Sequence, residues 1–125
     1  MERLYTNDHQ WIEQEGKTLT LGITDFLLDK LGAIIFVNLP QEGEEVFQGA
    51  KYGDIEGKKT VYDLMAPASG KVLEVNEVLY DDPGVLDRKD GEYWLIKVET
   101  DSEISGLMSE EQYKEFTDKP WAKKH

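Results

Sequence analysis

The chain has 125 residues, of which 39% are hydrophobic and 10% aromatic, and it contains no cysteine. This size and composition predict a single domain spanning residues 1–125 that needs neither metal nor disulfide to fold. Without cysteine, disulfides, thiolate metal sites and a cysteine nucleophile are excluded. The net charge of −12 disfavours nucleic acid and suits partners with basic surfaces. We expect no signal peptide and no membrane span, hence a cytoplasmic protein without a membrane partner.

The first forty residues or so contain two strand patterns on either side of a short helix pattern. Alternating apolar and polar side chains predict a strand with one buried face, and a β-branched apolar run predicts a strand inside a sheet. Between them, leucines at helical spacing follow a threonine N-cap and precede a glycine C-cap. In chain order we expect a loop at 5–11, a turn at 13–16, a half-buried strand at 17–23, a helix between Thr24 and Gly32, and a central strand at 33–39.

The rest of the chain contains short strand patterns separated by turns rich in glycine and proline. We expect strands at 45–47, 51–56, 60–66, 71–75 and 94–98, an irregular segment at 76–90, and a C-terminal helix opened by a capping box at 109–112. Many short strands with few helices predict a mainly β fold. The expected form is a flattened β-barrel or sandwich, with a short helix in the N-terminal half and a C-terminal helix.

Patterns that would support catalysis are missing from the sequence. The serines occur in turn or capping contexts, and His9 beside Asp8 has no further partner near it in sequence. Phosphate loops, dinucleotide fingerprints and metal-ligand spacings are also absent. We therefore expect a protein that is not itself an enzyme and that holds no metal.

A pair of lysines, Lys58 and Lys59, occupies the turn of the hairpin expected over residues 51–66. Lysine in a surface turn is commonly ordinary solvated surface. The alternative is a modification site, in which a rigid turn presents one amine to an acylating enzyme. Glycine turns frame the pair almost symmetrically, with Gly49 and Gly53 before it and Pro67 and Gly70 after it. This frame is typical of a lipoyl or biotinyl domain, and it favours the modification site.

Matching segments run in order through nearly the whole chain, at 5–11, 21–25, 31–40, 53–59, 63–76 and 91–98. Together they resemble the H protein family of the glycine cleavage system and its H-like relatives. The resemblance implies a lipoyl group on Lys59, because Glu56, Asp63 and Pro67 set the register on this lysine. Biotin carriers flank their lysine with methionines, which are missing here.

The resemblance also implies a function and a set of site residues. A non-catalytic lipoyl carrier would shuttle the aminomethyl group of glycine between glycine decarboxylase, aminomethyltransferase and dihydrolipoyl dehydrogenase. Lipoate ligase or a lipoyl or octanoyl transferase would first modify Lys59. The flanking turn, which would meet these partners, consists of Glu56, Gly57, Lys58, Thr60 and Asp63.

Several residues depart from the family pattern. Gly57 and Lys58 replace a Ser-Val pair and Thr60 replaces an alanine, while Gln10 and Lys30 replace a glutamate and a frequent histidine. The last two changes remove an anion and add a cation near the expected arm, which works against a positively charged cargo. One alternative is therefore an H-like lipoate-binding protein that carries sulfur intermediates for a heterodisulfide-reductase-like complex. Another is an unmodified or lipoyl-relay interaction module.

Overall fold

The computed structural model describes residues 3–88, 93–101, 103–104 and 106–118. Short strands dominate it, as the sequence predicts. The elements are β1 (Arg3–Tyr5), β2 (Gln10–Glu15), β3 (Thr18–Ile23), α1 (Asp25–Leu31), β4 (Ile34–Asn38), β5 (Glu45–Val46), β6 (Lys51–Gly57), β7 (Val61–Met65), β8 (Gly70–Val75), α2 (Val78–Asp81), the 3₁₀ helix η1 (Pro83–Arg88), β9 (Ile96–Glu99) and α3 (Glu110–Thr117).

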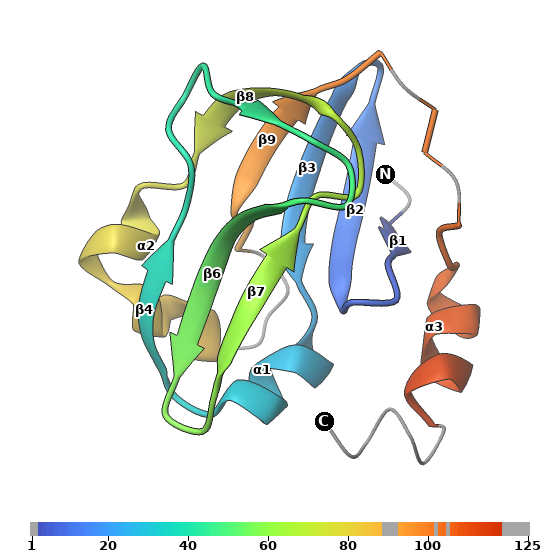
Figure 1. Ribbon diagram of the computed structural model, residues 1–125. Coiled ribbons are helices and arrows are strands. Elements are labelled where there is room, and N and C mark those ends of the chain that lie inside the picture. The colour runs from blue at the N-terminus through green and yellow to red at the C-terminus, as the bar shows by residue number, and fades with distance from the viewer. Residues whose placement is uncertain (1–2, 89–92, 102, 105, 119–125) are drawn as a thin grey trace.

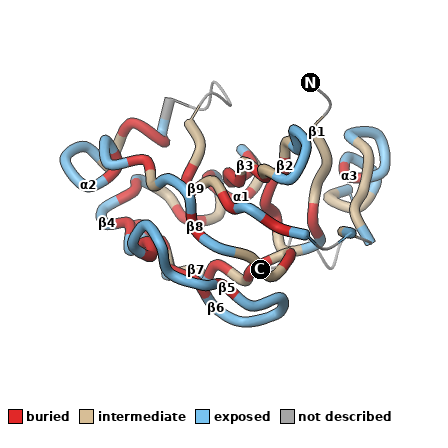
Figure 2. The backbone as a smooth tube through the Cα atoms, turned by 90° about the horizontal axis from the view of Figure 1, so that it is seen from above, coloured by how far each residue is buried: buried red, intermediate tan, exposed pale blue. Residues whose placement is uncertain are grey.

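The strands form two antiparallel sheets (Figure 1). The wide sheet has the order β1-β2-β3-β9-β8-β5, and the hairpin sheet has the order β4-β6-β7. The two sheets form the layers of a flattened sandwich, and Figure 2 shows buried segments in both layers. The expected mainly β fold, with one short helix in the N-terminal half and a C-terminal helix, is confirmed.

The core lies between the sheets and takes side chains from both of them. Strand alternation places Leu21 of β3 and Ile55 of β6 inward, and both are buried. The leucine stripe of α1 closes one end of this core, as its helical spacing predicts. Thr24 caps α1 through its side-chain oxygen, and α3 begins with the expected capping box at Ser109.

Some predicted boundaries are wrong. The strand at 33–39 is not central: β4 forms an edge of the hairpin sheet. Its outer edge is covered locally by η1, since the Asp87 carboxylate accepts the Ile34 N–H at 3.2 Å. The segment at 13–16 is strand as far as Glu15, because cross-strand pairing to 18–20 overrides the low strand propensity of its glutamates. The loop expected at 5–11 is also shorter, because β1 ends at Tyr5 and β2 begins at Gln10.

The segment at 76–90 was expected to be irregular but contains α2 and η1. Leu79, Val85 and Leu86 are buried, so apolar anchors hold these short helices against the body even though the sequence between them is rich in turn residues. No helix in the described part of the chain is long and apolar enough to cross a membrane. Nor do the described residues bring together three acidic or histidine side chains that could hold a metal.

Candidate functional site

The lysine pair lies in the turn that joins β6 to β7. Lys58, Lys59 and Thr60 are exposed, and the N–H of Gly57 donates to the carbonyl of Thr60 at 2.9 Å, which closes the turn. Figure 1 shows this turn beside α1, at the far end of the hairpin from β5 and β8. The position confirms the hairpin that the sequence predicts.

The turn is fixed to the C-terminal end of α1 by its own backbone. The N–H of Lys59 donates to the carbonyl of Leu31, and the N–H of Lys58 donates to the carbonyl of Ala33, both at 2.9 Å. Carbonyls in the last turn of a helix have no partner within the helix. The hairpin turn therefore satisfies the end of α1, and α1 in return restricts the motion of the turn.

Gly57 makes this close approach possible. A Cβ atom at this position would lie 2.1 Å from the carbonyl oxygen of Leu31. A side chain here would push the turn away from α1 and lengthen the two hydrogen bonds described above. The departure from the family pattern at Gly57 therefore has a physical role in this chain.

The two lysine side chains have different surroundings. The stem of Lys59 passes over Gly32, whose own Cβ, if present, would lie 3.1 Å from Lys59 Cγ. Lys59 Nζ then donates to the carbonyl of Asp29 in α1 at 3.4 Å. A helix C-terminus attracts cations, which favours this position for an ammonium group. Among the described residues the side chain of Lys58 has no such partner.

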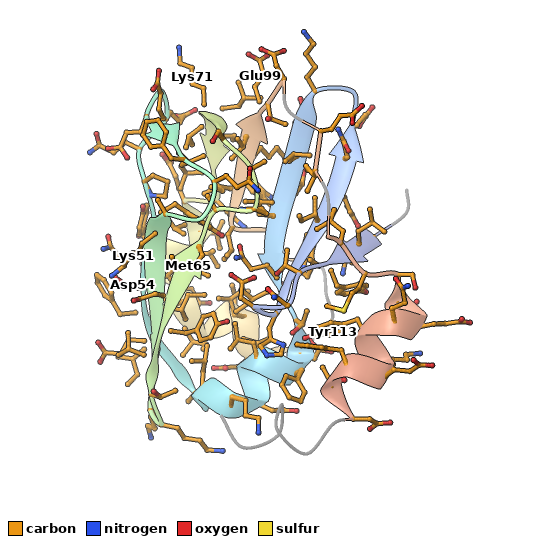
Figure 3. The ribbon with its side chains drawn as sticks, turned by 45° about the vertical axis from the view of Figure 1, so that its right-hand side comes forward. Lys51, Asp54, Met65, Lys71, Glu99 and Tyr113 are labelled. Carbon is orange, nitrogen blue, oxygen red and sulfur yellow. The ribbon has the colours of Figure 1, made fainter. Side chains whose placement is uncertain are left out.

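Glu56 and Asp63 do not converge on Lys59. They lie on the outer face of the hairpin sheet, with Glu56 beside Val61 and Asp63 beside Asp54 in the strand register. Lys51 Nζ bonds to Asp54 and Asp63 at 3.1 Å and 3.2 Å (Figure 3). These hydrogen bonds raise the pKa of Lys51. The structure thus places the two acidic residues on a surface beside the turn.

An apolar cleft opens next to the lysine turn. It has a volume of about 380 Å³ and is lined by residues 7–9, by α1 and by residues 60–62. We call it the α1 cleft. Phe26 and Leu27 give it a largely apolar wall, and Thr60 and Val61 lie at its boundary with the turn. The sequence contains no single motif for this cleft, because its walls come from three separate segments.

The charged residues of the α1 cleft are Asp8 and Lys30. The Asp8 carboxylate accepts hydrogen bonds from Gln10 Nε2 at 3.2 Å and from the Thr6 hydroxyl. Lys30 extends from α1, with its Nζ 5.3 Å from the ring centre of Phe26. The prediction that Lys30 adds a cation here is consistent with this position.

Gln10, in contrast, does not line the cleft. Its side chain is fully buried, donates to the carbonyl of Met65 at 2.8 Å and accepts the Tyr52 hydroxyl at 2.5 Å. Its Nε2 also donates to the Asp8 carboxylate, so Gln10 lies directly behind the cleft wall, and the expectation that it removes an anion near the arm stays a prediction. Gln10 ties β2 to the hairpin sheet, and the adjacent acidic residue, Asp8, carries the charge that faces the cleft.

His9 connects the cleft wall to the C-terminal helix. Its Nδ1 lies 2.8 Å from the hydroxyl of Tyr113, which lies 2.7 Å from Thr24 Oγ1 at the start of α1. Tyr113 points from α3 towards the two sheets (Figure 3). Its ring stacks on the ring of Tyr5, with 4.7 Å between the ring centroids. His9 was expected to have no partner that completes a site. The partner is 104 residues away in sequence, so no local pattern could reveal it.

Three tyrosines in this part of the protein have a raised pKa. Burial raises the pKa of Tyr113 to about 12, and it also raises the pKa of Tyr52 and of Tyr62. Asp8 adds to the shift in all three, although in Tyr113 the hydrogen bond with Thr24 acts in the opposite direction.

We expect these tyrosines to make the fold sensitive to alkali. Above pH ~10 the unfolded chain releases phenolic protons that the folded chain retains, so the free energy of unfolding falls as the pH rises. Each such tyrosine contributes a slope of up to about 1.4 kcal/mol per pH unit. Urea titrations between about pH 9 and pH 11 would measure this slope, and Tyr113→Phe should make it shallower. An unchanged slope in this variant would contradict the role of Tyr113.

The arrangement offers one evident chemical group, a primary amine on a rigid turn. Lys59 Nζ is exposed, so a second protein can reach it, and the backbone that carries it is held by α1. An acylated amine at this position would have the α1 cleft beside it. Acylation would convert the ammonium into a neutral amide.

The chain is similar to known glycine cleavage system H proteins over almost its whole length. The family model described as "Glycine cleavage H-protein" matches residues 3–120. The glycine cleavage system H protein of Staphylococcus saprophyticus is 44% identical, with 92% of this chain and 94% of that protein covered. The one from Alkaliphilus oremlandii is also 44% identical, with 93% of each covered.

A solved structure leads to the same family. The crystal structure of a glycine cleavage system H protein from Mycobacterium marinum superposes with a TM-score of 0.79 at 36% identity, covering 93% of this chain and 94% of that one. The agreement of sequence and fold over nearly the full length settles the family. The chain belongs to the glycine cleavage H-protein family.

Proposed function

We propose that this protein is the lipoyl carrier of a glycine cleavage system and that lipoate is attached to Lys59. The observation that carries the proposal is the exposed Lys59 amine on a turn fixed to α1, beside an apolar cleft. Family membership supports the same assignment. The chain would act as one carrier domain, without catalysing a reaction itself, in the cytoplasm.

The residues around Lys59 fit a lipoyl group. The amine is accessible, and its stem lies in a track that Gly32 leaves open. The group is an aliphatic chain that ends in a dithiolane ring, and the wall formed by Phe26 and Leu27 offers it apolar contact. Bound to Lys59, lipoate would supply a disulfide that accepts the aminomethyl group of glycine and is afterwards reoxidised.

The residues of the chain would perform three tasks in this function. The backbone bonds of Lys58 and Lys59 to α1 hold the attachment point still. The carbonyl of Asp29 holds the free amine of Lys59 before acylation, through the proton on Nζ. The apolar wall of the α1 cleft would exclude water from the end of the lipoyl group and from its cargo when they lie in the cleft.

Charge in the α1 cleft bears on which cargo the protein carries. Asp8 favours a cationic cargo and Lys30 opposes it, by interactions that nearby solvent weakens. Lys30 is the observation that favours the second candidate function, a lipoyl carrier of sulfur intermediates. Asp8 and the named relatives favour glycine cleavage.

The partners proposed are glycine decarboxylase, aminomethyltransferase and dihydrolipoyl dehydrogenase, together with the lipoate ligase or the lipoyl or octanoyl transferase that modifies Lys59. Intact-protein mass measurement of the chain from cells that make lipoate should show one lipoyl group, on the peptide that contains Lys59. Bare Lys59 in such cells would favour the unmodified interaction module.

The cargo is tested by exchange of label into glycine. The lipoylated protein, mixed with glycine decarboxylase and labelled bicarbonate, should support exchange well above the rate with the unmodified protein. If the lipoylated protein gives no exchange above background, the glycine cleavage assignment fails and the sulfur carrier becomes the better candidate.

A further inference from the structure

Exposed apolar side chains gather on the outer face of the hairpin sheet, next to the lysine turn. Ile35 is 50% exposed, Phe36 56% and Val61 55%. In the strand register Phe36 pairs with Glu56, and Glu56 pairs with Val61, so these residues form a row across the sheet. We call Ile35, Phe36 and Val61 the outer patch. Glu56 lies within it.

A β-bulge accounts for two of the three residues of this patch. The pairing of β4 with β6 shifts register between Ile34 and Phe36, which leaves Ile35 as an extra residue. Regular alternation would turn one of two neighbouring side chains inward. Here Ile35 and Phe36 are both exposed, while Ile34 and Val37 on either side of them are buried. Bulges commonly reorient side chains in this way near functional sites.

The outer patch has an acidic surrounding. Asp54 and Asp63 pair with each other two residues further along the strands, on the same face as Glu56 and Val61, and they share the ammonium group of Lys51. Figure 3 shows Lys51 and Asp54 on this side of the hairpin sheet. With the chain at a net charge of −12, a partner for this face needs an apolar centre and basic groups around it.

We propose that the outer patch is the docking surface for the enzyme that acylates Lys59, an inference that rests on the proposed function. Enzymes that act on the attached lipoyl group can bind its reactive end at a distance from the surface of the carrier. The acylating enzyme meets the chain before any lipoyl group is attached, so it must bring the Lys59 amine itself into its active site. It must therefore contact the surface immediately around the turn.

The outer patch meets this requirement by its position. Val61 directly follows the turn and Glu56 precedes Gly57, so the row that they form with Phe36 begins at the base of the turn. An apolar strand at the edge of a sheet can pair with a strand of another chain and cause aggregation. β4 is such a strand, and η1 covers only part of it. A surface of this kind beside a modified lysine is best explained by a partner that covers it.

The test is the rate at which a purified lipoate ligase, given lipoate and ATP, modifies the unlipoylated chain. Phe36→Ser should lower kcat/KM by about tenfold or more, mainly through KM, because it removes an apolar anchor. Glu56→Lys should lower it by a similar factor, and the loss should shrink as salt is added. Intact-protein mass measurement follows the reaction, and thermal melting confirms that each variant is folded.

Phe47→Ser is the matched control. Phe47 is also an exposed phenylalanine, at 60%, but it lies near Lys71 and Glu99, away from the lysine turn (Figures 1 and 3). It should be acylated at the unaltered rate. Equal rates for Phe36→Ser and the unaltered chain, or an equal loss with Phe47→Ser, would overturn the docking surface while leaving the proposed function intact.

Two further outcomes distinguish a failure of the docking surface from a failure of the proposed lipoyl-carrier function. If the unaltered chain is not acylated at Lys59, the proposed function falls, and the docking surface falls with it. If Phe36→Ser is acylated normally but then supports weaker glycine exchange, the patch belongs to glycine decarboxylase and the assignment to the acylating enzyme is wrong.

Discussion

Lys59→Arg should abolish lipoylation and all glycine exchange, while leaving the fold as stable as before. Arginine keeps the positive charge and can still donate to the carbonyl of Asp29, but it cannot form the amide that carries the arm. An exposed turn residue makes little contribution to packing, so the free energy of unfolding should change by no more than about 0.5 kcal/mol. Mass measurement after incubation with ligase, and urea unfolding, would give the two readouts.

Lys58→Arg is the control for this experiment. Lys58 occupies the same exposed turn and carries the same amine, yet its N–H donates to the carbonyl of Ala33, and the carbonyl of Asp29 is bonded by Lys59 Nζ instead. This variant should be lipoylated at close to the unaltered rate. A lipoyl group on Lys58, in the unaltered chain or in Lys59→Arg, would show that the turn does not select between the two amines.

The hairpin and its lysine pair were accessible from the sequence because the signals for them are local. Two strand patterns with a short polar turn between them predict a hairpin wherever they occur. The choice of Lys59 over Lys58, however, came from register against the family, and the local pattern left it open. The structure adds a physical distinction: the Lys59 stem passes over Gly32 and its Nζ donates to the carbonyl of Asp29, a hydrogen bond that Lys58 does not make among the described residues.

The glycine frame was a useful signal with an incomplete explanation. Gly49 has a positive φ of 80°, as a turn glycine should. Gly53 and Gly70 lie inside strands, and a Cβ at either would meet a backbone oxygen of the neighbouring strand within 2.3 Å. Close packing of backbones therefore accounts for them. Sequence shows where a glycine stands, and the reason for it depends on its neighbours in space.

The polar network and the edge position of β4 were beyond sequence reasoning for a common physical cause. Gln10, Tyr52 and Met65 meet only after the two sheets pack together. An apolar run such as β4 has the same composition at the edge of a sheet as at its centre, so its composition could not reveal the outer patch. Contacts between distant segments decide both features.

Gln10→Ala should cause the largest loss of stability among single changes near the site, about 3 kcal/mol. The side chain is fully buried, so its removal leaves a cavity. It also leaves the Tyr52 hydroxyl and the Met65 carbonyl without their present partner. The melting temperature should fall by roughly 10 °C. Gln14→Ala is the control, because Gln14 lies on the same strand but is exposed, and its side chain donates to the nearby carbonyl of Gly16. This variant should change stability by less than about 0.5 kcal/mol.

Gln10→Glu separates loss of volume from loss of the donor. The introduced carboxylate fills the same space and can accept the Tyr52 hydroxyl, but it cannot donate to the Met65 carbonyl and it faces the Asp8 carboxylate. Burial and Asp8 should raise the pKa of the introduced carboxyl above its unfolded value of about 4.3. The variant should therefore match the unaltered chain most closely below that pH, and lose stability as the pH rises towards neutrality. If Gln10→Glu is as stable as the unaltered chain at neutral pH, the donor of Gln10 is dispensable, and the cost of Gln10→Ala must come from the cavity and from the lost acceptor of the Tyr52 hydroxyl.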